Sequence, residues 1–327
     1  MQRRDLLKSR AIQRRDPIAT GGIQRRDPIA TGAIQRRDLI TIGAALLASA
    51  TAGFAQQPPP PKAKITSSLM LWTLKGSFEE KLEIAARSGV QSVELVGEYA
   101  GWTDTDIARI KKLAQSFRLG MDVLIATPDW GSRPVSMVDP SQRDNFLADV
   151  RSAIVFAQKL EVPQLLLMSG NAIPGRTHDE QYASLLEGAK RAGDLVSAAN
   201  LTAIVEPLNS LVNHKGFFLN TCVEGAKLIR QVDNPHVRLL FDIYHEQVQT
   251  GNVIRTLTEA ADIVAVFHVA DNPGRNDPGT GEINYHNVYK AIQKTGYAGY
   301  VAMEYLPLGD PVQSLTKALN DFRTAMA

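Results

Sequence analysis

The feature that most constrains the fold is a regular alternation of short apolar runs with segments of helical periodicity, beginning near residue 64. The apolar runs are at 65–72, 92–96, 119–126, 164–168, 201–205, 237–241, 263–269 and 299–303. Strictly alternating strands and helices indicate a parallel sheet with right-handed crossovers. Eight such units in about 265 residues predict an α/β fold, a single (β/α)8 TIM barrel over 64–327 with eight helices.

A doubly wound open sheet is the structural alternative to the barrel. It usually carries a glycine-rich phosphate-binding turn after its first strand, and no such turn follows 65–72. The barrel is therefore the better interpretation of the alternation.

The first 55 residues have a different character. The tetrad QRRD recurs at 2–5, 13–16, 24–27 and 35–38, and the proline and glycine residues between the copies argue against a continuous helix. The last copy continues into a short apolar stretch and small residues, the order of an export signal, and its Arg36-Arg37 pair resembles a twin-arginine signal. We expect a repetitive leader and signal peptide over 1–55, a proline-rich linker over 56–63, and a periplasmic or secreted protein. An uncleaved membrane anchor is the alternative, so the membrane is contacted only through the leader.

Charge and cysteine content exclude several functions. Residues 1–55 carry +6 and the whole chain +2, so residues 56–327 carry −4, which does not favour nucleic-acid binding. The single cysteine, Cys222, cannot form an intrachain disulfide, and its helical context predicts a buried, inert thiol.

Four consecutive predicted strands bring an ionisable residue to the carboxyl-terminal face of the barrel, where TIM barrels carry their chemistry. These residues are Glu206, Asp242, His268 and Glu304. Taken singly, a glutamate at a strand end is usually solvated and a histidine in an apolar run is usually a core residue. Together they would crowd like charges, which is costly unless a cation neutralises them.

Three carboxylates and one imidazole suit a divalent ion, Mg²⁺ or Mn²⁺ foremost and Co²⁺ or Zn²⁺ as alternatives. His245, three residues after Asp242, is expected to contact the substrate. Trp72 ends the first strand and is expected to form an apolar wall of the substrate site, although a core position is equally compatible with its pattern.

The motifs around these residues resemble a known family. EPLN at 206–209, DIYHEQ at 242–247, HVADNPGRNDPGTGEINY at 268–285 and MEYLP at 303–307 resemble the hydroxypyruvate isomerase family. That family lies within the xylose-isomerase-like superfamily of TIM-barrel sugar isomerases and epimerases, and LMSGN at 167–171 is similar to its strand-4 motif. The resemblance covers roughly residues 65–325.

The resemblance implies a role for each residue of the cluster. Glu206 and Glu304 match the paired glutamates that bind metal and transfer the proton, and Asp242 and His268 match the other two ligands. The fourth ligand is glutamine in the nearest isomerases and histidine in the epimerase branches, so both branches stay open. The remaining matches at substrate-contacting positions are His245 and Arg275. Glu282 is grouped with them as a substrate-binding candidate without an assigned step, and a loop ion pair or cap is its alternative.

The implied activity is aldose–ketose isomerisation of hydroxypyruvate to tartronate semialdehyde through an enediolate. The predicted export of the protein favours the alternative, a sugar or keto-sugar epimerase or isomerase from the same superfamily. A non-catalytic sugar-binding protein and an apurinic endonuclease fit less well, because the former needs no glutamate pair and the latter needs more histidines. The expected partner is a small carbohydrate or keto acid, without nucleic acid, and pairing of barrels into a homo-oligomer is compatible with the resemblance.

Overall fold

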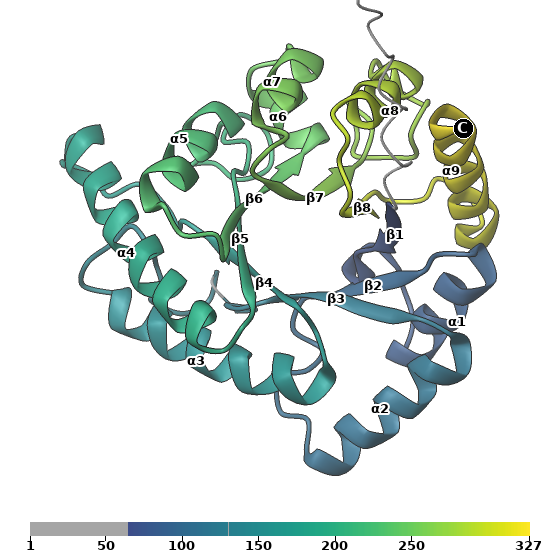
Figure 1. Cartoon of the computed structure of the whole chain (residues 1–327), viewed down its shortest axis with the longest axis horizontal. Helices are drawn as coiled ribbons and strands as arrows, with labels where there is room; N and C mark the ends of the chain where they lie inside the picture. Colours follow the sequence, from purple (N-terminus) through teal and green to yellow (C-terminus); the bar gives the residue numbers. More distant parts are fainter. Residues whose placement is uncertain (1–64, 130) are drawn as a thin grey trace, which may run out of the picture. The chain divides into compact units, whose positions relative to one another are not determined.

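Eight parallel strands pair side by side around a barrel in the computed structural model, which describes residues 65–129 and 131–327 (Figure 1). They are β1 Thr66–Leu69, β2 Ser92–Leu95, β3 Gly120–Ile125, β4 Gln164–Met168, β5 Thr202–Glu206, β6 Val237–Asp242, β7 Val264–Val269 and β8 Tyr300–Met303. The hydrogen-bonded order runs β1-β8-β7-β6-β5-β4-β3-β2. A parallel bridge between Met70 and Glu94 joins its two ends, so the predicted barrel is confirmed as a nearly closed one.

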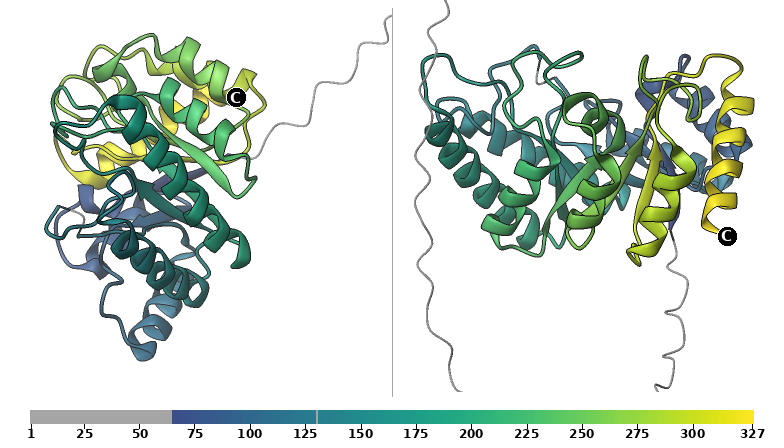
Figure 2. Two further views of the ribbon diagram at one scale, coloured as in Figure 1. Left: turned by 90° about the vertical axis from the view of Figure 1, so that its left-hand side faces the viewer. Right: turned by 90° about the horizontal axis from the view of Figure 1, so that it is seen from above.

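Helices cover the outside of the sheet (Figure 1, Figure 2). In the described part of the chain they are α1 Phe78–Ser88, α2 Asp104–Phe117, α3 Arg143–Leu160, α4 His178–Ala198, α5 Cys222–Val232, α6 Ile243–Gln249, α7 Val253–Ala260, α8 Tyr285–Lys294 and α9 Pro311–Met326. A 3₁₀ helix, η1 Leu71–Thr73, follows β1.

The sequence predicted one helix after each strand. Two helices follow β6, so the described residues contain one helix more than expected. The Asp242 side chain accepts a hydrogen bond from the backbone N–H of His245 and so starts α6 at the end of the strand. Gly251 and Asn252, both with positive φ, separate α6 from α7. The extra helix holds His245 at the carboxyl-terminal mouth of the barrel.

Local sequence explains where the outer helices begin. Capping boxes start three of them, with Ser77 and Glu80 at α1, Thr103 and Asp106 at α2, and Thr177 and Glu180 at α4. Cys222 begins α5 and is buried, and burial raises the pKa of its thiol well above the usual value, as expected for an inert residue.

The core has two parts. A large apolar layer fills the space between the strands and the surrounding helices, and a smaller cluster of side chains including Val123, Leu166, Ile204 and Leu240 fills the barrel itself. The barrel is therefore a packed core rather than a pore.

The predicted leader, signal and linker all lie outside the described residues. Within residues 65–129 and 131–327, none of the helices has the length and apolar character needed to cross a bilayer. The barrel falls within one compact unit of the chain, Pro59–Ala327.

Helix α4 packs so tightly on the segment after β3 that one glycine is essential to the contact. A Cβ atom at Gly188 would lie 2.6 Å from the carbonyl oxygen of Met137 and 2.7 Å from its Cγ. We expect Gly188→Ala to lower the free energy of unfolding by about 1–2 kcal/mol, because overpacking outweighs the gain in helix propensity. Denaturant titration measures this, with the exposed Lys190→Ala on the same helix as the control. A Gly188→Ala protein as stable as the control would contradict the tight contact.

Candidate metal centre and active site

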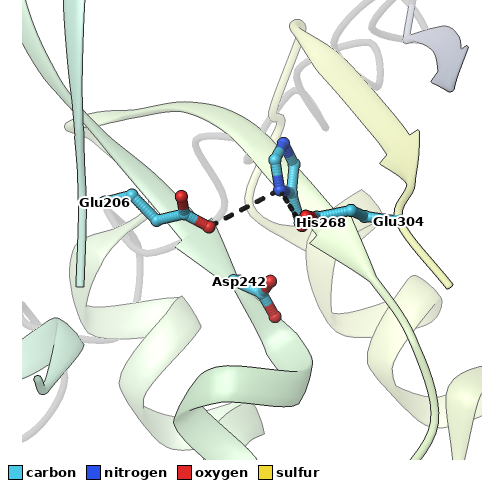
Figure 3. A group of neighbouring side chains, drawn as sticks. All are labelled: Glu206, Asp242, His268 and Glu304. Atoms are coloured by element: carbon cyan, nitrogen blue, oxygen red, sulfur yellow. Dashed lines mark hydrogen bonds and ion pairs between the residues drawn. The ribbon is translucent and has the colours of Figure 1, made fainter. Parts of the chain in front are cut away.

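Four buried side chains converge at the carboxyl ends of β5, β6, β7 and β8 (Figure 3). Glu206 and Asp242 are the last residues of their strands, His268 lies one residue before the end of β7, and Glu304 directly follows β8. Each offers one ligand atom, and these atoms all lie within 4.8 Å of one another. The structure thus brings together the four residues that the sequence predicted as a metal-ligand set.

His268 lies at the centre of this cluster and its two ring nitrogens face different groups. Nδ1 is 2.6 Å from Oε2 of Glu304 and 3.6 Å from Oε1 of Glu206, the two contacts drawn in Figure 3. Nε2 is 2.9 Å from Oε2 of Glu94 on β2. Burial lowers the pKa of His268, but the carboxylates of Glu94 and Glu304 raise it well above its usual value.

Glu304 is the most heavily bonded carboxylate of the cluster. Its Oε1 accepts a hydrogen bond of 2.8 Å from the indole N–H of Trp72 and lies 2.7 Å from a guanidinium nitrogen of Arg275. Burial opposes its ionisation, but the charges of Arg275 and His268 hold the pKa of Glu304 well below its usual range. Glu304 is therefore held in its ionised form.

For Glu206 and Asp242, in contrast, the surroundings oppose ionisation. Burial and the nearby charge of Glu304 raise the pKa of Glu206 well above its usual range and that of Asp242 to about 6. Oε1 of Glu206 is buried without a hydrogen-bond partner among the described residues. These groups lack the positive charge that would keep both ionised, and a divalent cation between the four ligand atoms would supply it. The residues present can hold such an ion.

The predicted substrate-contacting residues lie close to the cluster, with one exception. Arg275, in the loop between β7 and α8, has a φ of 56° and directs its guanidinium between the rings of Trp72 and Tyr244, at 5.0 and 5.5 Å from their centroids. His245 is almost fully buried, and its Nε2 lies 3.7 Å from Oδ2 of Asp242 without a hydrogen-bond partner among the described residues.

Trp72 lies in η1 with 38% of its surface exposed, so it is a rim residue that also contacts Glu304. Glu282 is the exception. Its exposed carboxylate accepts hydrogen bonds from Asn272 at 2.7 Å and Gln247 at 3.2 Å, in place of contacts to Trp72 or Arg275. Its assignment to substrate binding stays a prediction.

Two residues that the sequence did not single out contact the site, Glu94 through His268 and Asn209 through His245, and a third, Asp122, is a buried acid that bonds to Ser68 instead. Glu94 and Asp122 are acidic residues inside the apolar strands β2 and β3, and both are buried in the barrel. Asn209 donates its backbone N–H to Nδ1 of His245 at 3.3 Å. A charged residue within an apolar run is the signal that points to Glu94 and Asp122.

Comparison with known proteins identifies the family of this chain. The family model for the xylose isomerase-like TIM barrel matches residues 82–322. Because the match covers most of the chain, the protein belongs to this family, in agreement with the resemblance of its motifs.

Curated relatives narrow the class of protein. Hydroxypyruvate isomerase of Escherichia coli (strain K12) is 31% identical over 233 residues, which are 70% of this chain and 88% of that protein. The 2-oxo-tetronate isomerase of Pectobacterium atrosepticum is 25% identical over 248 residues, 75% of this chain and 93% of that protein. These relatives support an isomerase, as the sequence predicted.

Solved structures share the fold. A structure titled AP endonuclease, family 2, from Brucella melitensis superposes with a TM-score of 0.70 at 24% identity and covers 79% of this chain and 98% of that one. The 3-keto-D-glucoside 4-epimerase of E. coli does so with a TM-score of 0.66 at 20% identity, covering 80% and 100%. At these identities the likeness is evidence for the barrel alone.

The raised pKa of Asp242 predicts a pH-dependent penalty in the metal-free protein. An acid whose pKa is raised by folding destabilises the fold above that pKa, and the penalty disappears as pH falls toward its unfolded value near ~4. In EDTA we expect Asp242→Asn, which keeps the helix cap, to exceed the unchanged protein in stability by roughly 3 kcal/mol at pH 8. The difference shrinks as pH falls through about 6. Thermal or urea unfolding from pH 8 to pH 4 measures it, and a difference independent of pH would contradict the assignment.

Proposed function

We propose that this protein is a metal-dependent aldose–ketose isomerase that acts on a small hydroxy-keto acid of the hydroxypyruvate type. The observation that carries the proposal is the glutamate pair. Glu206 and Glu304 come from β5 and β8, on either side of His268, and both contribute to the group that can hold a metal (Figure 3). Binding alone gives no reason for two glutamates at such a centre, whereas moving a proton between adjacent carbons needs carboxyl groups placed to remove it and return it.

Proton transfer is assigned to these two side chains. Glu304, kept ionised by Arg275 and His268, removes the proton from the hydroxymethyl carbon, leaving an enediolate. A proton returns to the former carbonyl carbon from Glu206 or Glu304, while the hydroxyl proton passes to the other oxygen. Glu206 suits the role of proton donor, because burial and the charge of Glu304 favour its protonated form.

A divalent ion bound by Glu206, Asp242, His268 and Glu304 would bind the two substrate oxygens and stabilise the negative charge that develops on them. Mg²⁺ and Mn²⁺ are the expected ions, since three of the four ligands are carboxylates, and Co²⁺ or Zn²⁺ also suit the histidine.

The surroundings of the cluster favour an anionic substrate. Arg275 brings a permanent positive charge to the mouth of the site, 2.7 Å from Glu304 and 3.8 Å from Asp242. Nε2 of His245 is buried, 3.7 Å from Oδ2 of Asp242, and without a hydrogen-bond partner among the described residues, so it can bond to a substrate oxygen. A substrate carboxylate can pair with this guanidinium bidentately.

A sugar or keto-sugar epimerase is the second candidate. The twin-arginine-like leader, outside the described residues, supports an exported enzyme, for which a free sugar is a more accessible substrate than a metabolic keto acid. The same pair of glutamates would then serve opposite faces of one carbon, with one removing the proton and the other returning it.

We expect the purified full-length protein, loaded with Mn²⁺, to convert hydroxypyruvate to tartronate semialdehyde and to lose this turnover in EDTA. Glu304→Gln should lower kcat by at least about 100-fold, because the amide cannot accept the proton. Assays on hydroxypyruvate beside a panel of ketoses and keto-sugars measure this. Turnover of sugars alone would replace the first candidate with the second.

The control is Glu187→Gln, the same chemical change on the exposed face of α4, where the carboxylate pairs with Arg191. It should leave kcat unchanged. A Glu304→Gln protein that folds and retains full turnover would refute the role of Glu304 in proton transfer.

A further inference from the structure

Glu94 is a buried carboxylate that the proposed reaction leaves without a role. It is the third residue of β2, Ser92–Leu95, and its side chain is fully buried in the barrel. Neither of its oxygens has a hydrogen-bond partner among the described residues. A carboxylate in an apolar interior is costly, so its presence calls for a group that it serves.

His268 is that group. Oε2 of Glu94 lies 2.9 Å from Nε2 of His268, and both side chains have no exposed surface. The contact has the distance of an ion pair but not the alignment of a full hydrogen bond. On the opposite side of the ring, Nδ1 faces Glu304 and Glu206 at 2.6 and 3.6 Å. The imidazole thus lies between the proposed metal ligands and Glu94.

A histidine ligand binds a metal through one neutral ring nitrogen while the other nitrogen keeps its proton, and the partner of that proton fixes the ring. We propose that Glu94 is a positioning residue for the metal centre: its carboxylate receives the Nε2–H of His268 and so presents Nδ1 to the cation. This inference rests on the proposed function, because it requires that the four-residue cluster binds a metal.

The backbone is shaped to bring Glu94 to this position. The register of β2 with β3 shifts between Val93, opposite Met121, and Glu94, opposite Val123, which leaves Asp122 as an extra residue on β3. Such a bulge re-aims side chains and is frequent beside active sites.

Strand β7 carries a second irregularity before His268. Leu239 and Leu240 of β6 pair with Val264 and Val266, so Ala265 is skipped. After this shift His268 is directly opposite Asp242, its fellow ligand. A register shift therefore lies close to each of the two residues of the Glu94–His268 contact.

Asp122 supplies a matched control. It is as deeply buried as Glu94, and its Oδ1 accepts a 2.6 Å hydrogen bond from Ser68 rather than contacting His268. Burial and the neighbouring charge of Glu94 raise the pKa of Asp122 well above its usual range, so an asparagine closely mimics its neutral form.

The experiment compares metal binding by the full-length protein and its Glu94→Gln, Glu94→Leu and Asp122→Asn variants. Each is stripped with EDTA and titrated with Co²⁺ at one fixed pH, and the visible absorption of the bound ion reports both the Kd and the ligand geometry. We expect Glu94→Leu to weaken binding about 10–100-fold and to alter the spectrum. Glu94→Gln should lose less, because its amide oxygen still accepts the Nε2–H, and Asp122→Asn should bind as the unchanged protein does.

Metal binding within twofold of the unchanged protein, with an unchanged Co²⁺ spectrum, in Glu94→Gln and in any folded Glu94→Leu would overturn the role of Glu94. Equal losses in Asp122→Asn would also overturn it, since they would indicate a general effect of altering the barrel interior. If the unchanged protein binds no Co²⁺, the proposed metal centre fails and the inference fails with it. Turnover is not used, so failure of the isomerase assignment alone leaves this test intact.

Discussion

The structure depends on a concentration of buried negative charge at the mouth of the barrel. Glu206, Asp242 and Glu304 place ligand oxygens within 4.8 Å of one another, in a part of the molecule that water barely reaches. Coulomb repulsion at this separation is strong, and among the described residues His268 and Arg275 bring positive charge close to it. The result is an uneven division, in which Glu304 is held ionised and Glu206 is driven toward its protonated form. A cation would remove this imbalance, and this is the physical basis for proposing a metal centre here.

The fold creates the cluster by simple means. Parallel strands send their carboxyl ends to one face, so ionisable residues at the ends of β5, β6, β7 and β8 must meet there. Irregular features then set the positions of individual side chains. They are the register shift in β7 that brings His268 opposite Asp242, the cap by which Asp242 starts α6, and the left-handed backbone at Arg275. Such features cost stability, and they concentrate where side chains have to be aimed.

The barrel and the convergence of the four candidate ligands could be predicted because both follow from local patterns. Apolar runs mark the strands, whose observed bounds agree closely with them, and the residue after a run marks the mouth. Glu94 could not be assigned in this way, because its partner His268 lies far along the chain and becomes a neighbour only when the sheet closes. Helix α6 was missed for a related reason, since Asp242 is both strand end and helix cap. The motif around Glu282 suggests a substrate contact, which stays a prediction; in the structure its carboxylate accepts hydrogen bonds from Asn272 and from Gln247 of α6.

The account rests on one claim, that a divalent cation lies between Glu206, Asp242, His268 and Glu304. Diffraction from crystals grown with Mn²⁺, recorded so that manganese scatters anomalously, tests it most directly. The account predicts one strong peak about 2.2 Å from Nδ1 of His268 and from a carboxylate oxygen of each of the other three residues. Four ordered side chains without a peak between them, with Arg275 still paired to Glu304, would contradict it.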